Sequence, residues 1–123
     1  MRVWAGRSAS DALADVAAAP APSADAQLVL IDHSKEDYLR DLEACEALGL
    51  VRRGAVVVAD NVGILVADGY LEHVEAPPRA RAGDGWDAPP ARPERYATRM
   101  VAAPFESAPA LGDIDAMSIS RRL

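Results

Sequence analysis

Two short runs of consecutive apolar residues constrain the fold of this chain more than any other feature. They lie within Gln27 to Ile31 (QLVLI), whose last four residues are apolar, and Ala55 to Ala59 (AVVVA). Consecutive rather than alternating apolar residues are typical of strands buried on both faces, as in a parallel sheet covered by helices. Both runs therefore predict fully buried strands, and both end directly in polar residues.

The segment 35–48, between the two runs, has the clearest helical pattern. Its apolar residues recur at i, i+3 and i+4, which indicates one buried face, and Gly49 is placed to end the helix. The apolar stripe consists of Tyr38, Leu39, Leu42, Cys45 and Leu48. The polar positions expected to face solvent are Glu36, Asp37, Arg40, Asp41, Glu43 and Glu46.

Further elements are predicted on both sides of these strands. They are a short strand at Arg2 to Gly6, a helix within Ser8 to Ala19 capped by Ser8 or Ser10, a helix within Asp68 to Glu75, and strands at Arg95 to Pro104 and Asp113 to Leu123. The proline-rich segment 77–93 predicts a loop. Alternating strands and helices predict an α/β fold with a mainly parallel sheet, and residues 1–123 form one domain.

Composition excludes several classes of protein. The net charge of −6 argues against a nucleic-acid-binding surface, which needs a basic face. No segment approaches the roughly 20 apolar residues of a membrane span, and the N-terminus lacks the apolar core of a signal peptide. The single cysteine, Cys45, cannot form an internal disulfide or a cysteine-based metal cage, and is expected to pack inside its helix. We therefore expect a cytoplasmic protein that binds neither nucleic acid nor membrane.

Polar side chains follow both apolar runs, at the point where open α/β sheets place their ligands. Asp32 follows the first run, and Asp60 and Asn61 follow the second. If the two strands are neighbours, these residues supply three oxygen ligands, which suit Mg²⁺. The alternative is structural: Asp32 caps the next helix, and Asp60 and Asn61 begin a turn.

Basic side chains flank the same position. Lys35, close to a metal site and partly desolvated, would have a lowered pKa and could act as a base; the alternative is a solvated lysine at a helix start. His33 is either a pocket residue or the partner of a backbone carbonyl. His73 is expected to be a surface or packing residue, and the histidines and cysteine lack the spacing of a zinc site.

The segment LVLIDHSKEDYLRDLEACEALGLVRRGAVVVADNV resembles the C-terminal half of the catechol O-methyltransferase family. The motifs that carry the resemblance are a strand ending Leu/Ile-Asp32-His-x-Lys35, a Tyr-Leu helix, a Gly-Leu-x-x-x-Gly turn and a strand ending Ala-Asp60-Asn61. The resemblance covers residues 1–75 well and residues 95–123 more loosely.

The resemblance implies an S-adenosylmethionine-dependent enzyme that methylates a catechol-type hydroxyl. It implies Mg²⁺ bound by Asp32, Asp60 and Asn61, and Lys35 as the base that takes the hydroxyl proton. It places Ser8, Asp32 and His33 at the cofactor. It also implies a partial Rossmann-like methyltransferase fold with an antiparallel C-terminal strand.

The sequence departs from the family pattern at several positions. Ser34 stands in place of a large aromatic residue and Leu65 in place of a proline, both of which line the acceptor pocket in the family. The glutamate that orients the second catechol hydroxyl aligns with Val101, and Glu106 reaches that position only with a local shift. No Gly-x-Gly turn follows a strand, so the N-terminal strands that bind the cofactor are expected to be missing.

The family strand order, 3-2-1-4-5-7-6, would leave the order 4-5-7-6 here and expose an apolar sheet edge at Leu28 to Ile31. We therefore expect the isolated chain to be inactive, with a second chain as the possible source of the N-terminal half. The strand at Arg2 to Gly6 could instead move beside Leu28 to Ile31. The alternative functional hypothesis is a non-catalytic α/β fragment or interaction module that pairs through this edge.

Overall fold

A computed structural model describes residues 9–18, 26–63, 68–77, 93–104 and 114–123 of the chain. Its elements in chain order are α1 (Ala9–Ala18), β1 (Leu28–Ile31), the 3₁₀ turn η1 (Lys35–Asp37), α2 (Tyr38–Ala47), β2 (Val56–Ala59), α3 (Asp68–His73), β3 (Tyr96–Pro104) and β4 (Ile114–Arg122). The predicted strand at Arg2 to Gly6 and nearly all of the predicted loop 77–93 lie outside the described residues. The other predicted helices and strands are confirmed.

The described strands form one mixed sheet in the order β1-β2-β4-β3. β1 and β2 pair in parallel, whereas β4 is antiparallel to both of its neighbours, β2 and β3. β1, β2 and β3 therefore run in one direction and β4 in the other. The α/β class, the antiparallel C-terminal strand and the order expected for these strands are confirmed. The prediction of a mainly parallel sheet is wrong for the described strands, because β4 lies between β2 and β3 and two of the three strand pairs are antiparallel.

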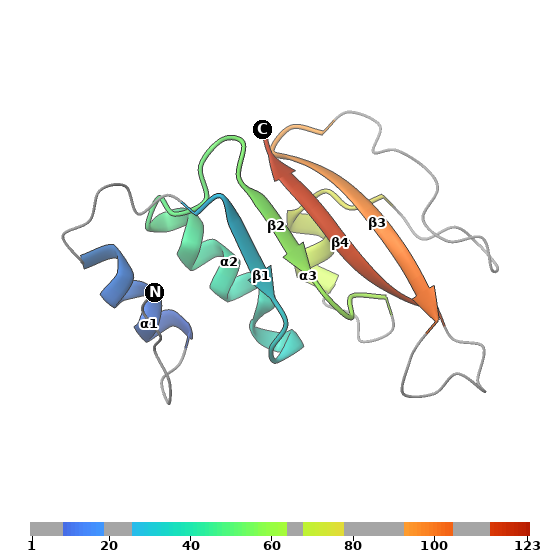
Figure 1. The fold of residues 1–123 in the computed structure, drawn as a ribbon, viewed down its shortest axis with the longest axis horizontal. Coiled ribbons are helices and arrows are strands. Elements are labelled where there is room, and N and C mark those ends of the chain that lie inside the picture. The colour runs from blue at the N-terminus through green and yellow to red at the C-terminus, as the bar shows by residue number, and fades with distance from the viewer. Residues whose placement is uncertain (1–8, 19–25, 64–67, 78–92, 105–113) are drawn as a thin grey trace.

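The described helices leave one face of the sheet uncovered. α2 and α3 lie behind the sheet in Figure 1, and α1 lies beside β1. Val57 and Ala59 point toward the helices and are fully buried, whereas Leu28 and Leu30 on the opposite face are 64% and 67% exposed. The prediction that both strands are fully buried is thus wrong. β1 is an edge strand of the described sheet, as expected from the family strand order, and in β2 Val57 and Ala59 are buried whereas Val56 and Val58 are partly exposed.

The core lies between the sheet and the helices α2 and α3. Tyr38 and Leu42 of α2, Tyr70 of α3 and Tyr96 of β3 are buried, and the Tyr38 and Tyr70 rings meet edge to face at 5.7 Å. Burial raises the pKa of Tyr70 to about 12, and its hydroxyl lies 3.2 Å from that of Ser118 on β4. These contacts fix α2 and α3 against the sheet, and with them the segments that follow β1 and β2.

Two positions of α2 differ from the predicted pattern. Leu48 is 40% exposed, because the helix ends at Ala47 and the chain turns through Gly49, whose φ of +71° suits glycine. Asp41, predicted to face solvent, is only 4% exposed, because it packs against His33. The rest of the apolar stripe is confirmed, with Tyr38, Leu42 and Cys45 buried.

Glu75 connects the end of α3 to the start of β3. Its carboxylate accepts hydrogen bonds from the backbone N–H groups of Glu94, Arg95 and Tyr96, at 3.0, 2.7 and 2.7 Å. Burial acts to raise the pKa of Glu75, but these three hydrogen bonds, with the charge of Arg95, lower it overall. One side chain thus joins two segments that are about twenty residues apart in the chain.

Candidate functional site

The carboxyl ends of β1 and β2 lie side by side. Ile31 pairs in register with Ala59, and the N–H group of Asp60 donates to the Ile31 carbonyl at 3.1 Å. Asp32 and Asp60 are therefore the next pair across the two strands, which in a sheet lie about 4.8 Å apart. The condition for a shared site, that the two strands are neighbours, is met.

Lys35 lies between the two strand ends. Its Nζ donates to the Tyr38 hydroxyl and, at 3.3 Å, to the Asp60 carbonyl, and lies 3.9 Å from Oδ1 of Asp32. The side chain is only 17% exposed, so the alternative of a solvated lysine does not describe it. The η1 turn produces this placement, because it directs Lys35 back over the end of the sheet instead of outward.

Tyr38 adds a hydroxyl that the sequence analysis did not assign to the site. Its ring is buried in the core, as the apolar stripe predicted, but its hydroxyl donates to the Asp60 carbonyl at 3.0 Å. Lys35 Nζ lies 4.5 Å from the ring centroid, a cation–π distance. Burial, the largest effect, raises the pKa of Tyr38. The spacing of three residues between Lys35 and Tyr38 was the available signal, since it places both on one face of a helical turn.

Asn61 is held in a turn by Asp115 of β4. Asn61 adopts a φ of +54°, a left-handed conformation that asparagine tolerates better than most residues. Its N–H group donates to Oδ1 of Asp60 at 2.8 Å, and its Nδ2 donates to Oδ2 of Asp115 at 2.8 Å. The second bond fixes the amide plane, so that the amide oxygen is the side-chain atom left for a ligand. The turn predicted as the alternative for Asp60 and Asn61 is therefore present, and it is compatible with a ligand site.

Asp115 is the second residue that the sequence analysis did not assign to the site. It is 6% exposed, and its Oδ1 also accepts from the N–H groups of Gly63 and Ala116, at 3.0 and 2.7 Å. Gly63 must lack a side chain, because a Cβ there would lie 2.6 Å from the Ala116 nitrogen. A strand that is antiparallel to its neighbour begins near the end of that neighbour. An acid at the start of β4 was therefore the signal in the sequence that Asp115 would lie near the end of β2.

His33 contacts Asp41 and Tyr38 of α2. Its Nε2 lies 3.0 Å from Oδ2 of Asp41, and its ring is 5.1 Å from that of Tyr38. It lines a hollow of about 230 Å³ between α1, β1 and α2, and its role in a ligand pocket stays a prediction. The other residues lining this hollow are Ala12, Leu13, Val29, Leu30, Ile31, Asp41 and Cys45.

The oxygen atoms at the ends of β1 and β2 are the candidate ligands for Mg²⁺. The part of the chain that the structure describes contains no group of three or more His, Cys, Asp or Glu placed to hold a metal. The candidate set instead combines two carboxylates with an amide oxygen. Asp32 is 58% exposed at its side chain, and the N-cap position of η1 is Ser34 and not Asp32, so the helix-cap alternative does not account for Asp32. Hard oxygen atoms on adjacent strand ends, with one carboxylate open to solvent, fit an ion that keeps several waters.

Two further positions singled out in the sequence are exposed in the structure, and three lie outside the described residues. Ser34 is exposed and donates to Glu36 at 2.5 Å, and Val101 is 42% exposed on β3. Ser8, Leu65 and Glu106 lie outside the described residues.

Cys45 and His73 have structural roles. Cys45 is buried, and burial raises the pKa of its thiol, as expected of a packing residue. His73 lies 3.0 Å from Oε2 of Glu46 and is 11% exposed at its side chain, which confirms it as a packing residue. No helix within the described ranges is long and apolar enough to cross a membrane.

The fold and these positions define an α/β protein with a candidate oxygen-ligand site at the carboxyl ends of two parallel strands. No family model matches the chain. Catechol O-methyltransferase B of Danio rerio is 47% identical over 47 residues, which are 38% of this chain and 18% of that protein. Catechol O-methyltransferases of Bos taurus and Sus scrofa are each 45% identical over 47 residues, which are 38% of this chain and 17% and 25% of those proteins.

A stretch of this chain is therefore similar to catechol O-methyltransferases, as the sequence motifs predicted. The matched stretch spans a quarter or less of the length of these relatives, and it is shorter than the range 1–75 over which a close match was expected.

Proposed function

We propose that this chain carries the metal-binding and base-bearing part of an O-methyltransferase site, for methyl transfer from S-adenosylmethionine to a catechol-type hydroxyl. The observation that supports it best is the position of Lys35, held between the strand ends that carry Asp32 and Asp60. The similarity of a 47-residue stretch to catechol O-methyltransferases supports the reaction class. The proposal includes a cytoplasmic location, which stays a prediction.

Asp32, Asp60 and Asn61 are the residues that would hold Mg²⁺. When bound, the ion would lower the pKa of an acceptor hydroxyl and orient it. Asp115 keeps the Asn61 amide in one orientation, and the N–H group of Asn61 does the same for Asp60. The turn at the end of β2 is therefore organised before any ligand arrives, which reduces the cost of binding.

Lys35 would take the proton from the acceptor hydroxyl. In its neutral form Nζ would accept that proton. S-adenosylmethionine, when bound, would supply the methyl group to the acceptor oxygen, and no covalent intermediate with the protein would be required. The Tyr38 hydroxyl and the Asp60 carbonyl hold Nζ at the strand ends, and the protein contributes mainly positioning.

The cofactor contacts of His33 and Ser8 remain predictions of the resemblance. His33 lines the hollow beside α1, at the same end of the sheet as Lys35. Because the sequence contains no Gly-x-Gly turn after a strand, we expect methyl transfer to require a further polypeptide that seats the methionine part of the cofactor.

Mg²⁺ binding by the full chain tests the site directly. Isothermal titration calorimetry should detect binding that weakens at least tenfold in Asp60→Ala. Glu43→Ala, which removes an exposed acid on α2, is the matched control and should bind as the unaltered chain does. Equal Mg²⁺ affinity in both variants, or no binding at all, would remove the basis for the proposal.

Complementation tests the reaction. The part of the zebrafish enzyme that precedes the matched stretch is added to this chain, and methyl transfer to catechol is measured with labelled S-adenosylmethionine. We expect Mg²⁺-dependent transfer that is lost in Lys35→Ala. If Lys35→Ala stays as active as the unaltered chain, Lys35 is not the base.

A non-catalytic interaction module is the second candidate, and the exposure of Leu28 and Leu30 at an edge strand favours it. A chain that self-associates or binds partners through β1, with no measurable Mg²⁺ affinity, would replace the first proposal with this one.

A further inference from the structure

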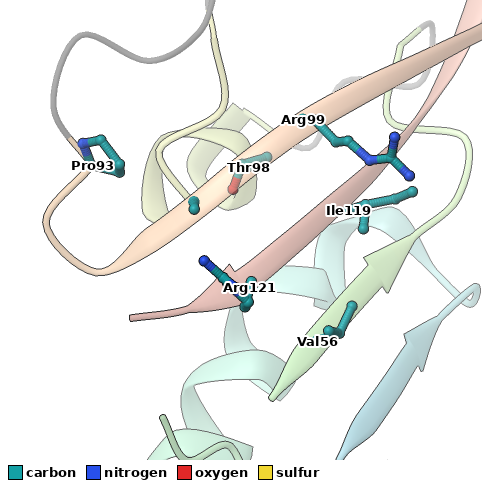
Figure 2. Close-up of a pocket in the computed structure, with 7 residues that line it drawn as sticks. Val56, Pro93, Thr98, Arg99, Ile119 and Arg121 are labelled. Atoms are coloured by element: carbon teal, nitrogen blue, oxygen red, sulfur yellow. The ribbon is translucent and has the colours of Figure 1, made fainter. Parts of the chain in front are cut away.

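Two cross-strand rows of side chains form the uncovered side of the sheet, and we call these eight residues the open face. One row is Leu28, Val56, Arg121 and Ala97, and the other is Leu30, Val58, Ile119 and Arg99. No described helix lies over them (Figure 1). Five of them, Val56, Ala97, Arg99, Ile119 and Arg121, line a hollow of about 570 Å³ (Figure 2).

The open face divides into an apolar side and a basic side. Four of its six aliphatic residues, Leu28, Leu30, Val56 and Val58, lie on β1 and β2, where Leu28 and Leu30 are mostly exposed, and both of its charged residues are arginines of β3 and β4. Arg121 lies across from Val56, and Arg99 lies across from Ile119. Figure 2 shows both arginines beside these apolar side chains. A ligand that covers the apolar side therefore presents one of its flanks to two positive charges.

We propose that the open face docks an amphipathic helix of a partner protein, with its apolar stripe over β1 and β2 and acidic side chains on the flank that meets Arg99 and Arg121. A helix is the element that covers an apolar sheet face in α/β proteins. Asp32 and Asp60 follow in the next row, so the acidic side chains of the helix lie away from the carboxyl ends of the strands. This inference rests on the sheet and is independent of the proposed methyl transfer.

Charge argues against two other occupants. A second copy of this chain would bring its own open face, whose charged residues are both arginines, and so offers no acid to pair with them. An anionic membrane would attract the arginines, but the chain carries a net charge of −6 and has the acids Asp32 and Asp60 beside the open face. An acidic amphipathic helix matches both the apolar and the basic side.

Two designed helical peptides of roughly 18 residues test the proposal against the full chain by fluorescence anisotropy. Both carry leucines at i, i+3, i+4 and i+7, and they differ only in glutamates or lysines along one flank. We expect the glutamate peptide to bind about tenfold more tightly than the lysine peptide. The double variant Arg99→Glu/Arg121→Glu should reverse that preference.

Arg52→Glu/Arg53→Glu changes the net charge by the same amount at the turn before β2 and should keep the preference for the glutamate peptide. If the reversed variant is not folded by circular dichroism, Arg99→Gln/Arg121→Gln should abolish the preference without reversing it. Equal binding of the two peptides, no binding of either, or a preference unaffected by reversal of Arg99 and Arg121 overturns the proposal.

Two further measurements decide between the occupants. Sedimentation of the chain alone should show a monomer, and a dimer that Leu30→Lys dissociates would assign the open face to a second copy. Vesicles containing phosphatidylserine should not bind, and binding that depends on Arg99 and Arg121 would assign the face to a membrane instead.

Discussion

Single polar atoms at the end of β2 organise the candidate site. The Asp60 carbonyl accepts from Lys35 and Tyr38, and the Asp60 carboxylate accepts from Asn61. Asp115 in turn holds Asn61 from β4. The residues that would contact a ligand are thus positioned by residues that would not, and each kind can be tested separately.

Asp115→Ala should weaken Mg²⁺ binding without removing a proposed ligand. The variant releases the Asn61 amide and leaves the Gly63 and Ala116 N–H groups without their acceptor, so we expect a 10- to 100-fold loss of affinity and a loss of about 2 kcal/mol in the free energy of unfolding. Calorimetry and urea unfolding measure the two effects. Unchanged Mg²⁺ affinity would mean that Asn61 is not a ligand.

Tyr38→Phe should reduce the rate of methyl transfer in the complementation assay and should have only a small effect on the free energy of unfolding. Loss of the hydroxyl removes one partner of Lys35 Nζ at a cost of about 1 kcal/mol. Tyr96→Phe is the matched control, because its hydroxyl bonds Glu46 away from the site and its loss should leave transfer intact. Equal activities of the two variants would contradict a positioning role for Tyr38.

Whole elements are joined by a few close contacts at their ends. Glu75 attaches the start of β3 to α3, and the turn after β2 packs against the start of β4 at Gly63. Because these contacts close long stretches of chain, their loss should loosen an element rather than a single side chain.

Glu75→Gln should make the protein less stable at neutral pH and remove part of its acid sensitivity. The pKa of Glu75 is lowered in the folded state, so its contribution is full above its unfolded value near 4.5 and is lost as the pH falls toward the folded value. The carboxylate is partly exposed, so we expect a loss of about 1 kcal/mol at pH 7. Urea unfolding at pH 7 and pH 3 measures it, and a difference that grows at pH 3 would contradict the assignment.

Gly63→Ala should destabilise the contact between the turn and β4. The added Cβ would lie 2.6 Å from a backbone nitrogen, so the turn must move, at a cost of about 1–3 kcal/mol. Gly54→Ala is a control for backbone strain without a steric clash. A Cβ at Gly54 would meet no neighbour within 4 Å, and only the φ of +92° is unfavourable for alanine. Thermal unfolding compares the two, and a Gly63→Ala variant as stable as the unaltered chain would mean that the turn is not held by β4.

The molecule as a whole is a sheet with one covered face and one apolar, partly basic face. Leu28 and Leu30 remain exposed at an edge strand, where unpaired backbone groups and apolar side chains both favour association. We therefore expect the open face to govern the association of the chain in solution.

Leu28→Thr/Leu30→Thr should raise the protein concentration at which aggregation begins. Threonine keeps the preference for strand structure but removes apolar surface, and at exposed positions the free energy of unfolding should change by only about 0.5 kcal/mol. Light scattering against concentration measures the effect. A loss of several kcal/mol would show instead that both leucines are buried in solution.

The sequence by itself determined the described helices and strands and the polar residues at the ends of β1 and β2, because local periodicity and turn residues are encoded within a few positions. The order of the strands in the sheet followed from the family resemblance. It predicted the burial of Tyr38, Leu42 and Cys45 but not that of Asp41, nor the exposure of Leu28 and Leu30. An apolar run specifies that a side chain can be buried, whereas the packed elements decide which face is covered. The tertiary structure alone brought Asp115 to Asn61 and Tyr38 to Asp60, since those contacts join residues 54 and 22 positions apart.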